Sequence, residues 1–188
     1  FYDWHFLNME LDDDNQDIIP SEKGDVFIAI NKCIDVLESD SVSDSEKSFY
    51  LKLLVHFVGD LHQPLHIGRY EDRGANRVYV KWFGRNSNLH RVWDSDMINS
   101  HNMSYSELAV NLPNPDFLVF TDEAKDFERA DVLDWVNEIH VYTNQIYAGV
   151  SVDDKLGYEY QYKNFGTVKE LLLIGGIRLA KILNYLFD

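Results

Sequence analysis

Histidine and aspartate side chains recur in this chain at spacings that suit metal coordination. His56 and Asp60 form one His-x-x-x-Asp pair, His90 and Asp94 form another, and His66 lies between them. Residues four apart lie about one turn apart on one face of an α-helix, so each pair can direct an imidazole and a carboxylate toward one ion. Histidine nitrogens and carboxylates are ligands that Zn²⁺ favours. The spacing therefore predicts a zinc centre.

These residues form two groups, and one group has more of the ligands that a zinc ion needs than the other. His66, His90 and Asp94 supply three protein ligands and leave a fourth position for water or substrate, as in catalytic zinc sites. His56 and Asp60 begin another site. A bridging Asp60 would hold two ions about 3.5–4 Å apart, the spacing used for in-line displacement at phosphorus. We therefore expect hydrolytic chemistry on a phosphate ester.

The composition limits the class of protein. The chain has 188 residues, of which 45% are apolar and 14% aromatic, which predicts one globular domain. Its net charge of −15 argues against a simple nucleic-acid binding module with a basic stripe. It does not argue against a metal-dependent hydrolase, because bound zinc would dominate the local field. The single Cys33 excludes an intrachain disulfide and is expected to be buried, and no apolar run is long enough to span a membrane.

Two helices should carry the first ligand pair and the segment before it. The apolar spacing predicts a helix from about Val26 to Glu38. Ser43 and Glu46 form a capping box in sequence, so the next helix should begin there. Pro64 disfavours helical geometry in the residue before it, so this helix should end near His62.

The rest of the pattern is also mainly helical. Arg77–Phe83 alternates well enough for one short strand, and Gly175 and Gly176 suggest a close helix crossing. The other expected elements are helices at about 89–99, 130–147 and 168–186, and loops at 12–16, at 69–76 and between Pro113 and Pro115. We predict a single all-α (mainly α) domain over residues 1–188, with at most a short β-hairpin.

The motifs resemble the zinc-dependent nuclease S-one and nuclease P-one family of single-strand nucleases and 3′-nucleotidases. The likeness lies in the stretch His56-Phe-Val-Gly-Asp-Leu-His-Gln-Pro-Leu-His66, the Gly74-Ala-Asn76 loop, Trp82-Phe-Gly84, Asn88-Leu-His-Arg-Val-Trp-Asp94, Trp4-His5-Phe-Leu-Asn8 and Gly175-Gly-Ile-Arg-Leu-Ala180. It covers essentially the whole chain.

The resemblance implies an all-α domain related to bacterial zinc phospholipase C, with three zinc ions in the complete family enzyme. It implies the ligands His5, His56 and Asp60 for the first ion, with Asp60 bridging, and His66, His90 and Asp94 for a more distant ion. His66 is preferred over His62, which would pack nearby. Phe6 would either stack on a base or belong to the core, and Asn76 would serve either the substrate or only the loop turn.

The implied reaction is hydrolysis of single-stranded DNA, RNA and 3′-mononucleotides, giving 5′-nucleotides or nucleosides, by a secreted or periplasmic enzyme. No protein partner is implied. Family ligands that precede the position of His5 are not found, so we expect the chain to lack an amino-terminal segment and to hold fewer than three ions. The alternatives are a phospholipase C-like hydrolase and a catalytically inactive zinc-binding protein.

Overall fold

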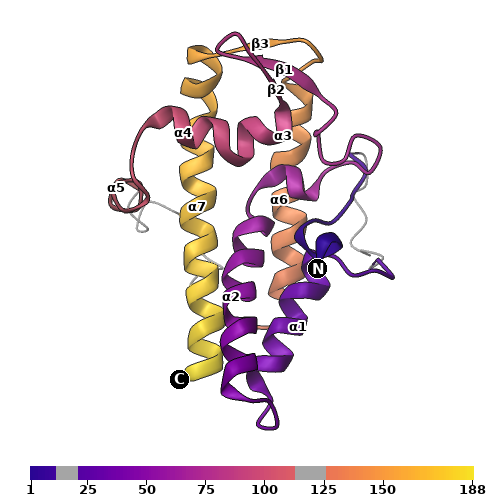
Figure 1. The fold of residues 1–188 in the computed structure, drawn as a ribbon, viewed down its shortest axis with the longest axis vertical. Helices are drawn as coiled ribbons and strands as arrows, with labels where there is room; N and C mark the ends of the chain where they lie inside the picture. The colour runs from indigo at the N-terminus through magenta and orange to yellow at the C-terminus, as the bar shows by residue number, and fades with distance from the viewer. Residues whose placement is uncertain (12–20, 113–125) are drawn as a thin grey trace.

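Long helices run along an elongated molecule, with a small sheet at one end (Figure 1). A computed structural model of the chain describes residues 1–11, 21–112 and 126–188. The loops expected at residues 12–16 and between Pro113 and Pro115 lie outside these residues. The structure confirms a mainly α fold.

The first two long helices begin and end close to the predicted residues. α1 (Val26–Glu38) begins after Asp25, whose carboxylate accepts a hydrogen bond from the Ile28 amide. α2 (Asp44–Leu61) begins after Ser43, whose hydroxyl accepts from the Glu46 amide, and ends at His62. Each side-chain acceptor satisfies an amide that has no partner within the helix.

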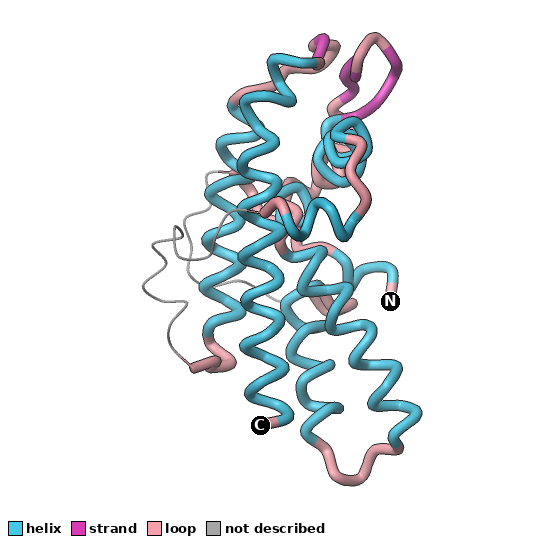
Figure 2. The backbone as a smooth tube through the Cα atoms, turned by 90° about the vertical axis from the view of Figure 1, so that its left-hand side faces the viewer, coloured by secondary structure: helices cyan, strands magenta, loops and turns pink. Residues whose placement is uncertain are grey.

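The last two long helices both run along the long direction of the molecule (Figures 1 and 2). α6 (Asp131–Ala148) matches its prediction. α7 (Tyr158–Phe187) begins ten residues before the predicted start near Val168. Its first three turns are rich in tyrosine and polar residues and are largely exposed, so they show no apolar stripe that would predict a helix.

Three short strands make up the sheet of the described residues, where the sequence predicted one strand. β1 (Tyr79–Trp82) pairs antiparallel with β2 (Arg85–Asn88) and parallel with β3 (Lys155–Leu156). β2 is polar throughout and β3 has two residues, so neither shows a strand pattern. Phe83 and Gly84, with φ of 47° and 80°, form the two-residue turn between β1 and β2.

The segment after the sheet is helical but irregular. α3 (Leu89–Arg91) continues into a π-helical stretch, η3 (Val92–Asp96), and then into α4 (Met97–His101). The helix predicted over about 89–99 is therefore present, but it contains a π turn, which inserts one residue that no apolar spacing reveals. A further helix, α5 (Tyr105–Val110), was not predicted.

Two apolar cores meet at a short 3-10 helix, η2 (Pro64–Ile67). Ile67 belongs to the core between the long helices, whereas Leu65 belongs to the core beneath the sheet, which also holds Trp82 and Trp93. Cys33 is buried in the first core, and burial raises the pKa of its thiol to about 12. No helix in the described part of the chain is long and apolar enough to cross a membrane.

A buried polar contact links α2, α6 and α7. The His62 ring bonds the Val58 carbonyl through Nδ1, and its Nε2 lies 3.1 Å from the Arg178 guanidinium, which also bonds Glu138. His62 thus packs as expected instead of joining the predicted ligands. A Cβ at Gly175 would lie 3.1 Å from this ring, whereas a Cβ at Gly176 would meet nothing within 4 Å. The predicted close crossing therefore applies to Gly175 alone.

The two neighbouring glycines should respond to alanine in opposite directions. Gly176→Ala should raise the free energy of unfolding by about 1 kcal/mol, because alanine favours a helix over glycine. Gly175→Ala should lower it, because the His62 ring is fixed at both nitrogens and cannot move aside. Urea unfolding of the two variants measures the difference, and equal effects would contradict this account of the crossing.

Candidate metal centre

The first predicted ligand group converges at one point. His5 ends η1 (Tyr2–His5), whereas His56 and Asp60 lie one turn apart on α2. His5 Nδ1 lies 2.8 Å from Asp60 Oδ2 and 2.9 Å from His56 Nε2, and His56 Nε2 lies 3.1 Å from the same carboxylate oxygen. Two distant segments thus bring three donor atoms together.

In this first group, the nitrogen and oxygen atoms that face one another carry more lone pairs than there are N–H protons to share between them. A neutral imidazole carries one N–H, so His5 Nδ1 can donate to Asp60 or accept from His56, but not both. Lone pairs of neutral nitrogens and a carboxylate that face one another repel unless a positive charge lies among them. The donor set therefore fits a cation.

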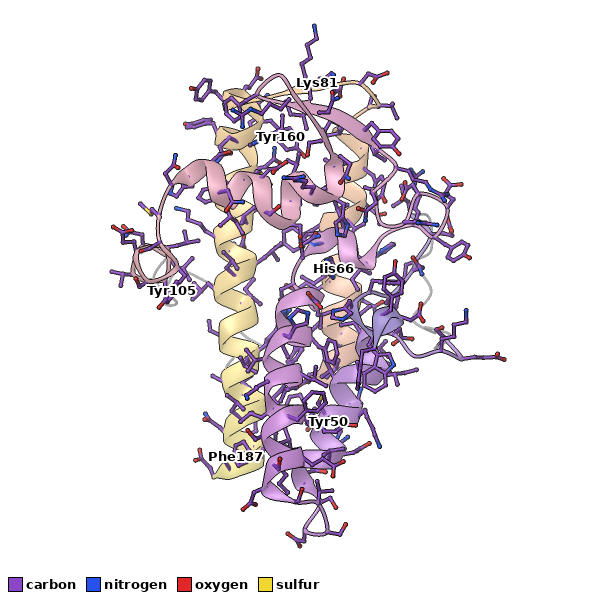
Figure 3. The ribbon with its side chains drawn as sticks, in the orientation of Figure 1. Tyr50, His66, Lys81, Tyr105, Tyr160 and Phe187 are labelled. Atoms are coloured by element: carbon purple, nitrogen blue, oxygen red, sulfur yellow. The ribbon has the colours of Figure 1, made fainter. Side chains whose placement is uncertain are left out.

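The second group forms beside the first, where η2 and α3 meet. One nitrogen or oxygen from each of His66, His90 and Asp94 lies within 4.8 Å of the others. The rings of His66 and His90 stack with centroids 5.0 Å apart, and His66 Nε2 lies 3.6 Å from Asp94 Oδ1. Figure 3 shows His66 at the middle of the molecule, between the long helices and the sheet.

Two backbone carbonyls orient the rings of this group. His66 Nδ1 lies 2.6 Å from the His5 carbonyl, and His90 Nδ1 lies 2.7 Å from the Gly74 carbonyl. Each Nδ1 must therefore carry the ring proton, because a carbonyl oxygen only accepts hydrogen bonds. The lone pair of each Nε2 is left to bind a metal ion. Metal-binding histidines characteristically donate their other ring N–H in this way.

Asp60 lies between the two groups. Its Oδ2 faces His5 and His56, and its Oδ1 lies 3.7 Å from His66 Nδ1. The carboxylate is only 15% exposed. The carboxylate thus belongs to the first group and borders the second, and its bridging role stays a prediction.

The second group also favours positive charge. Burial lowers the pKa of His66, but its hydrogen bond to Asp94 and the charges of Asp60 and Asp94 outweigh burial and raise it. The pKa of His90 is lowered, first by burial and then by the charge of His66. The neighbouring His66 ring is the main cause that lowers the pKa of Asp94. The two carboxylates thus favour positive charge at His66, whereas burial opposes it at His90.

A buried carboxylate that the sequence did not single out supports His90. Asp72 is 7% exposed and accepts hydrogen bonds from the Ala75 amide, at 2.7 Å, and the Tyr147 hydroxyl, at 2.8 Å. Arg69 bonds its other oxygen. These contacts fix the turn that carries the Gly74 carbonyl. No periodic pattern marks Asp72, so only the structure reveals its role.

The two predicted substrate residues lie at the edge of this centre. Phe6 follows His5 directly, is partly exposed and contacts Tyr2 edge to face. Asn76 is exposed, and its amide donates to the Arg73 carbonyl within the loop. The structure thus gives Asn76 a loop contact and leaves Phe6 accessible beside the first ligand group.

A cavity of about 240 Å³ opens beside both ligand groups, between α2 and α7. Asp60, Gln63 and Asp94 lie in its wall together with mainly apolar residues. The wall is therefore polar at the metal centre and apolar away from it. Such a cavity suits a ligand that has a charged part and a flat or apolar part.

Comparisons with known proteins give one family and several relatives for this chain. A family model described as S1/P1 nuclease matches residues 1–188. Endonuclease 2 of Arabidopsis thaliana is 32% identical over 73% of this chain and 51% of its own length, and Endonuclease 4 of the same plant is 32% identical over 80% and 54%. Nuclease S1 of Aspergillus oryzae is 32% identical over 75% and 55%. The chain thus spans about half the length of these curated relatives.

Replacing Gly74 should disrupt the second ligand group. Gly74 has φ of 59°, and a Cβ there would lie 2.2 Å from the Leu65 carbonyl oxygen. Gly74→Ala should therefore displace the carbonyl that orients His90, lower the free energy of unfolding by more than about 2 kcal/mol and weaken zinc binding. Calorimetric titration with zinc and urea unfolding measure both effects.

Gly84→Ala is the matched control, since Gly84 also has positive φ but open space around it. It should cost only about 1–2 kcal/mol and leave zinc binding intact. Equal loss of zinc in both variants would contradict a specific role for the Gly74 carbonyl.

Proposed function

This chain belongs to the S1/P1 nuclease family, and from that premise we propose that the protein is a zinc-dependent phosphodiesterase and 3′-nucleotidase that acts on single-stranded DNA and RNA. The observation that carries the proposal is the presence of two neighbouring groups of three His and Asp donor atoms, His5, His56 and Asp60 in one and His66, His90 and Asp94 in the other. Neighbouring metal positions are typical of phosphoryl-transfer sites.

The proposed ligand sets follow the two groups. His5, His56 and Asp60 would hold one zinc ion, and His66, His90 and Asp94 would hold another. Bound zinc would lower the pKa of the water that it coordinates and would neutralise charge on the phosphoryl oxygens.

The chain's own residues would prepare this chemistry in three ways. The carbonyls of His5 and Gly74 hold the rings of His66 and His90 in fixed orientations, so little reorganisation is needed. Asp60 would fix the two ligand groups relative to each other. Asp94, whose side chain is half exposed, borders the cavity and leaves that side of the centre open to substrate.

The cavity and its surroundings suit a nucleotide. Its apolar wall between α2 and α7 offers room for a base or sugar, while its polar end lies at the proposed metal ligands. On the other side of the centre, Phe6 is accessible for stacking on a base. We also propose, from the family, that the protein acts in the periplasm or outside the cell.

Removing a proposed ligand should remove zinc and stability together. Asp94→Ala or His90→Ala should lower zinc affinity by more than about a hundredfold. Changing a residue that only supports a ligand costs up to about a hundredfold, and loss of the ligand itself should cost more. Their melting temperatures should fall only when zinc is present, because metal binding stabilises the native state. His101→Asn, a histidine outside both groups, should retain zinc and serves as the control. Unchanged metal content in both ligand variants would refute the assignment.

A substrate panel separates the proposed activity from its alternatives. The zinc-loaded intact protein is given single-stranded DNA, duplex DNA, a 3′-mononucleotide and phosphatidylcholine. We expect hydrolysis of the single strand and the 3′-mononucleotide, and its loss on chelation. Hydrolysis of phosphatidylcholine alone would support a phospholipase C-like enzyme, and tight zinc without turnover would support an inactive metal-binding protein.

A further inference from the structure

Gln63 lies in sequence between residues of the two ligand groups. It follows His62 at the end of α2 and precedes Pro64, the first residue of η2. Its backbone amide donates to the Asp60 carbonyl at 3.0 Å, and its own carbonyl accepts from the His66 amide at 2.9 Å. The backbone of Gln63 is therefore tied to one residue of each ligand group, so its side chain starts from a fixed point.

The backbone holds one end of the Gln63 carboxamide. Oε1 accepts a hydrogen bond from the Leu65 amide at 2.7 Å, which caps η2. Because an amide N–H can only donate, the atom at this end of the carboxamide must be the oxygen. The nitrogen, Nε2, must therefore occupy the other end.

This Nε2 is a buried donor without an acceptor. The atom is shielded from solvent, and within the described residues it has no hydrogen-bond partner. A buried N–H group that is left unpaired lowers stability, so such groups are rare in native proteins and call for a reason. A donor kept for an acceptor that takes its place when an ion is bound has such a reason.

The Asp94 carboxylate lies near this donor. Gln63, Asp60 and Asp94 lie together in the wall of the cavity between α2 and α7. The pKa of Asp94 is lowered chiefly by the His66 ring and to a smaller extent by the Gln63 side chain, so the carboxamide lies beside the carboxylate. Asp60 faces the first ligand group, whereas the side chain of Asp94 is half exposed and has room to turn.

Metal binding would change the hydrogen bonds that are open to Asp94. His66 Nε2 lies 3.6 Å from Asp94 Oδ1, but this nitrogen is the one that the hydrogen bond at Nδ1 leaves for a metal ion. A ring nitrogen whose lone pair binds an ion has no proton to donate, so His66 would not hold Asp94 in the loaded centre. The carboxylate oxygen that does not bind the ion then needs another donor, because ligating carboxylates are characteristically hydrogen-bonded.

We propose that Gln63 is a positioning residue of the second ligand group, whose Nε2 donates to the Asp94 oxygen that does not bind the ion. This one hydrogen bond satisfies the buried donor and sets the orientation of the carboxylate toward His66 and His90. The inference rests on the proposed function, because it takes Asp94 as a zinc ligand. It deepens that function by giving a role to a side chain outside both ligand groups.

Gln63→Met tests the donor, because methionine keeps the length of the side chain but carries no N–H. Zinc affinity should fall about ten- to hundredfold, the loss typical of removing a residue that supports a ligand. Affinities are measured by competition with a chromogenic zinc chelator. The change also removes the acceptor of the Leu65 amide, so a second measurement must show that the loss acts through Asp94.

A double-mutant cycle with Asp94→Ala gives that measurement. In the Asp94→Ala background, Gln63→Met should cost less than about twofold in zinc affinity, because the carboxylate that Gln63 orients has been removed. An equal loss in both backgrounds would show that the change acts on η2 and His66, and it would overturn the inference.

Gln145→Met is the matched control, since Gln145 is exposed on α6 and belongs to neither ligand group. It should leave zinc affinity unchanged. With Co²⁺ in place of Zn²⁺, the visible absorption of the fully loaded protein should change in Gln63→Met, because the carboxylate turns, and not in Gln145→Met. A Gln63→Met spectrum identical to that of the parent would overturn the positioning role.

These measurements also separate the inference from the proposed function. A parent protein that binds no zinc would refute both, because the metal centre itself would be wrong. A parent that binds zinc and hydrolyses single-stranded DNA, with the same zinc affinity in Gln63→Met, would overturn only the role of Gln63.

Discussion

Two hydrogen bonds, from the Nδ1 atoms of His66 and His90 to the backbone carbonyls of His5 and Gly74, determine what this centre can do. They select the tautomer of each ring and leave its second nitrogen for the group that includes Asp94. Each carbonyl belongs to a segment distant in sequence from the ring that it holds. The fold is therefore needed to position the backbone as much as to position the ligands.

Much of the helical framework and both His–Asp pairs could be predicted from sequence, because apolar spacing, helix caps and the four-residue His–Asp spacing are local signals, whereas His5 was expected only from the family resemblance. α2 begins at Ser43 and ends at His62 for the predicted reasons. The missed features depend on distant contacts or weak local patterns. β3 exists only because residues near Lys155 reach β1, and the buried Asp72 acquires its role only from Tyr147 on α6.

Overall charge and local charge lead to different conclusions in this chain. The net charge of −15 describes the average surface and argues against general affinity for phosphate backbones. Residues 69–91, with six basic and two acidic side chains, are a local exception to this average. Because salt screens charges beyond about 8–10 Å, a ligand beside this stretch experiences mainly its charges. Composition alone could exclude a simple basic binding module but could not locate such a stretch.

The parallel pairing of β1 with β3 also bears on how the protein folds. Lys81 contacts Lys155, so this edge of the sheet cannot close until the chain between them, which includes α6, has been placed. Contacts between residues far apart in sequence carry a large loop-closure entropy and form slowly. The hairpin of β1 and β2 can form early, since its partners are adjacent. During synthesis, His90 and Asp94 would leave the ribosome well before the element that completes the sheet beside them.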